Sequence, residues 1–300
     1  MTAAALPIAD RPALGVALMT GFCLCAPLAD ATAKLLAAAL PVAFLVLVRF
    51  AAQAVLLWPL ALATRRPLGM ARRAWALTAL RTALQVAGIW LFTAALVHLP
   101  LADAIAIIFV MPFLLLLAGH LLLGEEVGPH RLAACAVGFL GTLMVVQPAF
   151  REVGWPALLP LAVAFVFASF MLVTRLLAKA ADPIVMQAHS GWMACAALVP
   201  ALALSGPLVP QGASALWPQL VLLGVLGTFG HLLMTWSLRF APSATLAPMQ
   251  YLEIPIATLY GLVIFGDLPD GLAAAGIAVT VAAGLYTIHR ERRGSGAHDG

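Results

Sequence analysis

The sequence predicts an all-α integral membrane protein, and three observations lead to this fold class. Of the 300 residues, 64% are hydrophobic and only 9% are charged, whereas a soluble domain carries about 25% charged residues. The apolar residues form ten stretches of about 20 residues, the length that an α-helix needs to cross the bilayer core. The two halves of the chain also repeat each other. We therefore expect ten transmembrane helices, arranged as two inverted five-helix repeats around a central cavity.

Proline and glycine residues mark most of the boundaries between the expected helices. The first stretch follows only Asp10 and Arg11 and runs beyond the apolar region of a signal peptide, so we interpret it as a retained helix. The loops are too short to hold a soluble domain. The expected helices are 14–37, 42–62, 74–97, 101–123, 131–148, 155–178, 184–205, 216–238, 243–265 and 271–289.

Basic residues gather on one side of these helices. Lys and Arg in short loops stay on the cytoplasmic side of a membrane. An N-terminus inside the cell places 12 of the 16 basic residues in cytoplasmic loops and tails. The partition requires an even number of spans. We expect a multi-pass protein of the cytoplasmic (inner) membrane whose short tails, 1–13 and 290–300, are both cytoplasmic.

The second half of the chain repeats the first at a constant offset. Two five-helix repeats, 14–148 and 155–289, are therefore the predicted domains. An odd number of spans in each turns the second repeat upside down, which is typical of secondary transporters that bind substrate between their repeats. The matched residues are Leu91, Thr93, Leu96, Pro100, Ala102, Phe109, Gly119, Gly124 and Glu125 with Leu233, Thr235, Leu238, Pro242, Ala244, Tyr251, Gly261, Gly266 and Asp267.

Rows of small residues in the fifth and tenth helices also match. The rows Ala134, Gly138, Thr142 and Gly276, Thr280, Gly284 have a spacing of four, which places each row on one face of its helix. Small residues let helix backbones approach closely in membranes. We expect these two helices to pack on each other, away from the cavity.

Several stretches resemble a known family. They are LADAIAIIFVMPFLLLLAGHLLLGEE at 101–126, VGFLGTLMVVQP at 137–148 and ATLAPMQYLEIPIATLYGLVIFGDLPD at 244–270. They resemble the paired EamA modules of the drug/metabolite transporter superfamily. DATAK at 30–34, LVRF at 47–50 and APMQYLE at 247–253 are similar to its branch of S-adenosylmethionine-uptake and riboflavin-transporter-like proteins. The resemblance implies ten helices around a cavity, alternating access and small metabolites as substrates. Asp267 departs from the glutamate that is usual in the second module.

Glu253 is the leading candidate for a functional residue. A carboxylate inside a bilayer costs at least a few kcal/mol, so it faces a partner or a watery cavity. Gln250 and Tyr251 precede it closely. Glu253 is interpreted either as a cavity acid, which binds a cationic substrate group or takes a proton, or as a structural carboxylate. His231, whose ordinary titration range suits proton coupling, is a second candidate for that role, the alternative being a hydrogen bond within the bundle.

Charged residues of the first three expected helices form a second candidate group. Asp30 and Lys34 are four residues apart, so they share a helix face and either form a local ion pair or contact substrate. Arg49 pairs with Asp30 or holds an anionic group. Arg81 reaches the headgroups or pairs with another helix. Glu125, Glu126 and Asp267 follow helices and are topological or gating residues.

Aromatic residues at cavity depth are the remaining candidates. Trp90, Phe109 and Tyr251 carry flat rings that would stack on a planar substrate or bind a cation. Each could equally serve helix packing alone.

Other functional classes lack their sequence signals. An intramembrane enzyme would need a nucleophile–base cluster or grouped metal ligands, and neither H-E-x-x-H nor G-x-S-x-G occurs. We expect no enzyme activity, cofactor, metal site or nucleic-acid partner. The expected partners are a small-molecule substrate and the lipid bilayer, and the expected assembly is a monomer or homodimer. The predicted function is a secondary transporter of an amino-acid-like, nucleoside-like or cofactor-like metabolite; the alternative is a passive channel or membrane scaffold.

Overall fold

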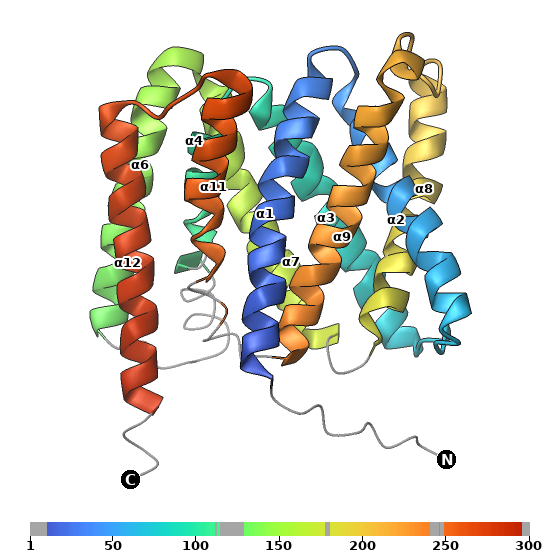
Figure 1. Ribbon diagram of the computed structural model, residues 1–300, viewed down its shortest axis with the longest axis horizontal. Coiled ribbons are helices and arrows are strands. Elements are labelled where there is room, and N and C mark those ends of the chain that lie inside the picture. Colours follow the sequence, from blue (N-terminus) through green and yellow to red (C-terminus); the bar gives the residue numbers. More distant parts are fainter. Residues whose placement is uncertain are drawn as a thin grey trace.

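The computed structural model describes residues 11–111, 113–114, 129–177, 181–240, 246 and 249–295. Every regular element among them is helical, and the long helices run alongside one another in a single bundle (Figure 1). The longer elements are α1 (Pro12–Ala37), α2 (Val42–Ala63), α3 (Arg72–Leu96), α6 (Pro129–Val153), α7 (Leu159–Leu177), α8 (Pro183–Ser205), α9 (Trp217–Phe240) and α12 (Gly271–Ser295). The shorter ones are α4 (Leu101–Ile108), η1 (Trp155–Leu158), η2 (Ala213–Leu216), α11 (Glu253–Tyr260) and η3 (Gly261–Phe265).

Apolar length identifies a multi-pass membrane protein. Six helical stretches of the described residues are long and apolar enough to cross a membrane. They are Ala13–Ala37, Val42–Ala63, Arg72–Leu96, Trp155–Thr174, Pro183–Ser205 and Ala213–Ser237. The expected helices 14–37, 42–62, 74–97, 155–178, 184–205 and 216–238 correspond to these stretches.

Two of the expected helices are interrupted. The prediction of continuous helices over 101–123 and 243–265 was wrong in this respect. Helix α4 ends at Ile108, where Phe109 and Val110 form a turn, and α11 begins at Glu253 after a turn at Tyr251 and Leu252. Proline explains the start of α11, because Pro255 lacks the N–H that would bond the carbonyl oxygen of Tyr251 four residues earlier.

The packing of the helices follows the repeat in the sequence. Helices α6 and α12 pair at one edge of the bundle and α2 and α8 at the other (Figure 1). Between them α1 packs on α9, and their counterparts in the other half, α7 and α3, also pack on each other. The expected packing of α6 on α12 is confirmed, because Thr280 Oγ1 donates to the carbonyl oxygen of Gly138 at 3.4 Å. The rows themselves were only partly right, since Gly284 faces Tyr251 and the closest approach to Gly276 is made by Gly141, outside the predicted row.

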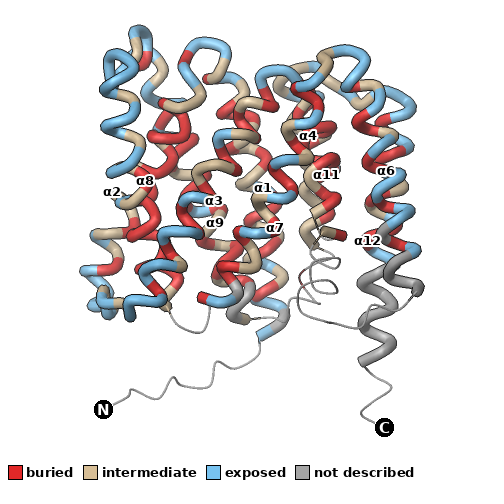
Figure 2. The backbone as a smooth tube through the Cα atoms, turned by 180° about the vertical axis from the view of Figure 1, so that it is seen from behind, coloured by how far each residue is buried: buried red, intermediate tan, exposed pale blue. Residues whose placement is uncertain are grey.

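The two ends of the bundle differ in charge. Helix α2 ends and α3 begins at the end that carries Arg65, Arg66, Arg72 and Arg73, which we call the basic end. Arg11 lies there too, and its backbone N–H donates to the carbonyl of Phe240. Buried residues run through the middle of the bundle, whereas exposed ones cover its ends and outer faces (Figure 2).

Candidate functional site

A cavity lies between the helices in the interior of the bundle. Its volume is about 120 Å³, whereas one enclosed water needs about 10–15 Å³. It therefore has room for several waters or part of an organic ligand. Its lining residues come from α1, α2, α3, α4, α7, α9 and α11, so both halves of the chain build it.

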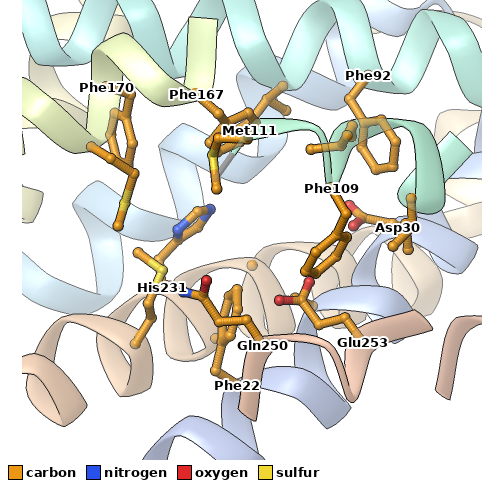
Figure 3. A pocket seen from close by; sticks show the side chains of 18 of the residues that line it. Phe22, Asp30, Phe92, Phe109, Met111, Phe167, Phe170, His231, Gln250 and Glu253 are labelled. Carbon is orange, nitrogen blue, oxygen red and sulfur yellow. The ribbon is translucent and has the colours of Figure 1, made fainter. Parts of the chain in front are cut away.

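Five phenylalanine rings form much of the cavity wall, together with methionine side chains. In Figure 3, Phe167, Phe170 and Met111 face Gln250 and Glu253 across the open space. Of these five rings, only Phe109 is among the candidates expected from the sequence. A helical spacing could have revealed another, because Phe22 and Asp30 lie eight residues apart on one face of α1. The rings are Phe22, Phe92, Phe109, Phe167 and Phe170.

The polar groups of the cavity include three of the expected residues. Gln250 and Glu253 enter from the segment around the start of α11, and His231 enters from α9 (Figure 3). Within the described part of the chain, the side chain of Glu253 has neither a hydrogen bond nor an ion pair. The sequence prediction that Glu253 faces a cavity beside Gln250 agrees with this geometry.

Asp30 and Arg49 form an ion pair in the cavity wall. Arg49 Nη1 donates to Asp30 Oδ1 at 3.0 Å, and the side chains are only 9% and 15% exposed, respectively. Gly227 of α9 makes room for the guanidinium, since a Cβ there would lie 3.1 Å from Arg49 Nε. Of the two alternatives for Arg49, the structure therefore supports the pair with Asp30.

The local ion pair of Asp30 with Lys34 was a wrong expectation. Lys34 Nζ instead donates to Asp267 Oδ2 at 3.2 Å and to the carbonyl of Leu99 at 2.9 Å. It also lies 4.6 Å from the centre of the Phe265 ring. Spacing alone did not exclude the local pair, but longer-range partners were available to both residues. Lys34 is not part of the cavity lining.

The three aromatic candidates have different positions. Phe109 lines the cavity, and its ring centre is 5.0 Å from that of Tyr251. Tyr251 is itself buried behind the lining, where its hydroxyl lies so close to Gly284 that a Cβ there would overlap it. Trp90 is 45% exposed and does not belong to the lining. The structure thus separates Trp90 and Tyr251 from direct contact with the cavity.

Arg81 lies immediately behind the cavity wall. Its side chain is fully buried, so of the two alternatives for Arg81 the structure supports contacts with other helices and not the headgroups. The guanidinium lies 4.6 Å from the centre of the Phe170 ring and donates to Thr174 Oγ1 and Ser190 Oγ, both at 3.1 Å. It thereby links α3 to α7 and α8. Glu125 and Glu126, the other expected gating acids, lie outside the described residues.

The match to a protein family agrees with a cavity built from both halves. The model of the EamA-like transporter family matches this chain twice, at residues 13–147 and 154–288. The chain belongs to the EamA-like transporter family. The resemblance to the drug/metabolite transporter superfamily is confirmed.

Relatives of this EamA-like transporter include carriers of small metabolites. A riboflavin transporter of Rhizobium johnstonii is 32% identical over 221 residues, 71% of this chain and 70% of that protein. A riboflavin transporter of Vibrio cholerae is 27% identical over 262 residues, 85% of this chain and 86% of that one. An S-adenosylmethionine uptake transporter of Rickettsia felis is 25% identical over 217 residues, 71% and 72% of the two chains. These relatives identify this EamA-like protein as a transporter of a small metabolite.

A solved crystal structure shares the fold. At 20% sequence identity it superposes on this EamA-like chain with a TM-score of 0.63, covering 93% of this chain and 97% of the other. Within the EamA-like cavity, flat apolar rings would bind a planar molecule, and Glu253, Gln250 and His231 offer polar atoms at its rim. No group of three or more potential metal ligands occurs among the residues described.

Proposed function

We propose that this EamA-like protein carries a planar nitrogen heterocycle of the riboflavin class across the cytoplasmic membrane. The observation that carries the proposal is the cavity wall of five phenylalanine rings, beside which lie the carboxamide of Gln250 and the unpaired carboxylate of Glu253. Aromatic rings stack favourably on flat ring systems. The polar groups would then orient the heterocycle through its ring nitrogens, carbonyl oxygens and attached hydroxyls. The names of three relatives as riboflavin transporters support the same substrate class.

In this proposal ten helices cross the membrane as two inverted repeats, 14–148 and 155–289, with both ends of the chain in the cytoplasm. The reciprocal packing of α1 on α9 and of α7 on α3 supports a two-fold relation between the repeats. The interrupted helices α4 and α11 support a binding site between them, because discontinuous helices surround the substrate in many secondary transporters. Substrate would move by alternating access.

Glu253 is assigned the polar contact to the substrate, or the proton that accompanies it. Gln250, Phe109 and the Asp30–Arg49 pair complete the proposed substrate site, and His231 is the second candidate for proton coupling. Tyr251 supports Phe109 from behind. Trp90 and Lys34, which do not line the cavity, are left out of the proposed contacts.

The unpaired carboxylate of Glu253 favours a second candidate substrate. A cationic molecule such as S-adenosylmethionine combines a flat purine with a sulfonium charge, which the carboxylate would neutralise. The name of the Rickettsia felis relative supports this class. Both candidate substrates contain a flat ring, so the aromatic wall does not discriminate between them. Their relative strength as inhibitors of uptake distinguishes the two.

The test is transport by purified protein in proteoliposomes. We expect saturable uptake of labelled riboflavin, accelerated by unlabelled riboflavin trapped inside, since a carrier shows counterflow and a pore does not. Unlabelled riboflavin outside should inhibit more strongly than S-adenosylmethionine. Stronger inhibition by S-adenosylmethionine would favour the second candidate. Uptake that neither saturates nor shows counterflow would exclude a carrier of riboflavin, and liposomes without protein provide the baseline.

A further inference from the structure

A second recess lies on the outer surface of the bundle near the basic end. Helices α2, α3 and α8 surround it, and these three helices lie together at one side of the bundle (Figure 1). Its volume is about 410 Å³, and it shares no lining residue with the central cavity. The lining residues are Trp58, Trp75, His189, Trp192, Met193 and Ala196.

His189 holds the recess in shape. Its ring centre is 5.2 Å from that of Trp58 and 4.6 Å from that of Trp75. Its Nε2 donates to the carbonyl of Leu68 at 3.0 Å, which fastens the α2–α3 loop to α8. These contacts of His189 hold the side chains of Trp58 and Trp75 and the α2–α3 loop in fixed positions around the recess.

The tryptophans offer unused hydrogen-bond donors. Trp192 is 59% exposed and Trp75 is 38% exposed. No indole N–H of Trp58, Trp75 or Trp192 donates to another residue in the described portion of the structure. Indoles with an apolar body and a free N–H are suited to the boundary between lipid chains and headgroups.

The first turn of α3, the helix that carries Trp75, holds two further arginines. Arg72 and Arg73 begin α3, both are exposed, and neither has an ion pair with any residue that the structure describes. Arg72 precedes Trp75 by three residues, so the two lie on the same side of the helix. Arg66 differs, because it already pairs with Asp182.

We propose that this recess binds one anionic phospholipid. The phosphate lies on Arg72, and Arg73 adds positive charge at the same end of α3. The indole N–H groups donate to phosphate or ester oxygens, and one acyl chain follows Trp192 and Met193 along α8. Charge complementarity selects an anionic headgroup, and the exposed apolar lining selects a lipid over a soluble anion. The proposal rests on the proposed membrane orientation, in which the basic end meets the cytoplasmic leaflet.

Native mass spectrometry of the full-length protein in detergent tests the headgroup preference. Dioleoyl phosphatidylglycerol and dioleoyl phosphatidylcholine are compared at equal concentration. We expect one phosphatidylglycerol to bind in preference to phosphatidylcholine, and the double variant Arg72→Gln/Arg73→Gln to bind it about 20- to 30-fold more weakly. The matched control is Arg151→Gln, an exposed arginine in the last turn of α6 at the opposite end of the bundle, which should leave binding unchanged.

Tryptophan fluorescence tests the position of the lipid. Phosphatidylglycerol with brominated acyl chains should quench the wild type more than the Trp192→Leu variant, whereas excess inorganic phosphate should not relieve the quenching. Equal binding of both lipids, or equal binding by the double variant and the wild type, would overturn the proposal. Relief by phosphate would identify a soluble-anion site and overturn it too. Riboflavin uptake is measured separately, so failure of the lipid site and failure of the proposed transport function are distinguishable.

Discussion

Phe109 and Tyr251, which occupy matching positions in the two halves of the chain, lie with their ring centres 5.0 Å apart. Phe109 lies in the turn that follows α4, and Tyr251 lies in the turn that precedes α11. Gly138 and Thr280 are also a matching pair, and a hydrogen bond joins them. If a two-fold axis relates the two repeats, residues at equivalent positions that lie close to the axis also lie close to each other. Both pairs fit this relation.

That relation predicts the membrane topology. Because each proposed repeat has an odd number of spans, a reporter inserted after residue 150 and one at the C-terminus should lie on opposite faces of the membrane. The location of each position is measured with a pair of reporter enzymes, one active only outside the cytoplasm and one active only inside it. Detection of both positions on the same face would contradict the inverted repeats and, with them, the alternating-access mechanism.

Glu253→Gln should abolish substrate uptake while leaving expression and folding intact. The substitution keeps the size and the polarity of the side chain and removes its charge and its ability to take up or release a proton. Uptake in membrane vesicles and the melting temperature of the purified protein are measured together. Glu152→Gln, at an exposed position near the end of α6, is the control and should transport normally. Normal uptake by Glu253→Gln would remove this residue from the substrate site.

The Asp30–Arg49 pair should behave as a unit. Loss of one partner leaves a largely buried charge without compensation, which costs about 3–5 kcal/mol. Asp30→Asn and Arg49→Gln should therefore each lower the melting temperature clearly. The double variant should recover part of that loss, because no unpaired charge remains. Additive losses in the double variant would show that the two side chains are not coupled.

The contacts of Lys34 predict a gate at the end of the cavity opposite the basic end. Lys34 joins α1 to the α3–α4 turn through Leu99 and to the segment after η3 through Asp267. Its side chain is 17% exposed and that of Asp267 is 38% exposed, so the ion pair contributes about 1 kcal/mol or less to stability. Such an energy still changes the ratio of closed to open states by up to about fivefold.

Asp267→Asn should consequently open this end without unfolding the protein. We expect a membrane-impermeant maleimide to label Ile105→Cys, a position in the cavity wall, several times faster in the Asp267→Asn background. The native cysteines are first replaced by serine. Asp270→Asn, in the same loop, is the matched control because Asp270 caps α12 and does not contact Lys34. An unchanged labelling rate would show that the Lys34–Asp267 contact does not control access.

Local sequence patterns predicted what depends on one helix at a time. Apolar length placed most helices within a few residues, and the rows of small residues predicted that α6 and α12 pack on each other, since both are properties of a single helix. The contact faces were predicted only in part, because Gly141 lies outside the predicted row. The position of Glu253 and Gln250 in the cavity lining could also be predicted, because a polar side chain in an apolar segment needs a polar environment.

The choice between possible partners could not be made in this way, because the sequence left both Lys34 and Arg49 open as partners of Asp30. Asp30 has Lys34 within one turn of its own helix, yet it pairs with Arg49 of α2. The reason is the rotation of α1 against its neighbours, which depends on the packing of the whole bundle. The aromatic wall was missed for the same reason: Phe167 and Phe170 have the composition of ordinary core residues, and only the fold shows that they border open space.

The contact between α6 and α12 gives the most direct test of packing. A Cβ on Gly276 would lie 2.5 Å from the carbonyl oxygen of Gly141, and backbone cannot move aside as a flexible side chain can. Gly276→Ala should therefore force the two helices apart and cost about 1–3 kcal/mol, measured as a lower melting temperature in detergent. Gly271→Ala, in the same helix, is the matched control, because a Cβ there meets no other atom within 4 Å. Alanine at position 271 should leave stability unchanged or raise it slightly, since alanine favours the helix. Equal melting temperatures for the two variants would mean that the close approach of α6 and α12 is not needed for stability.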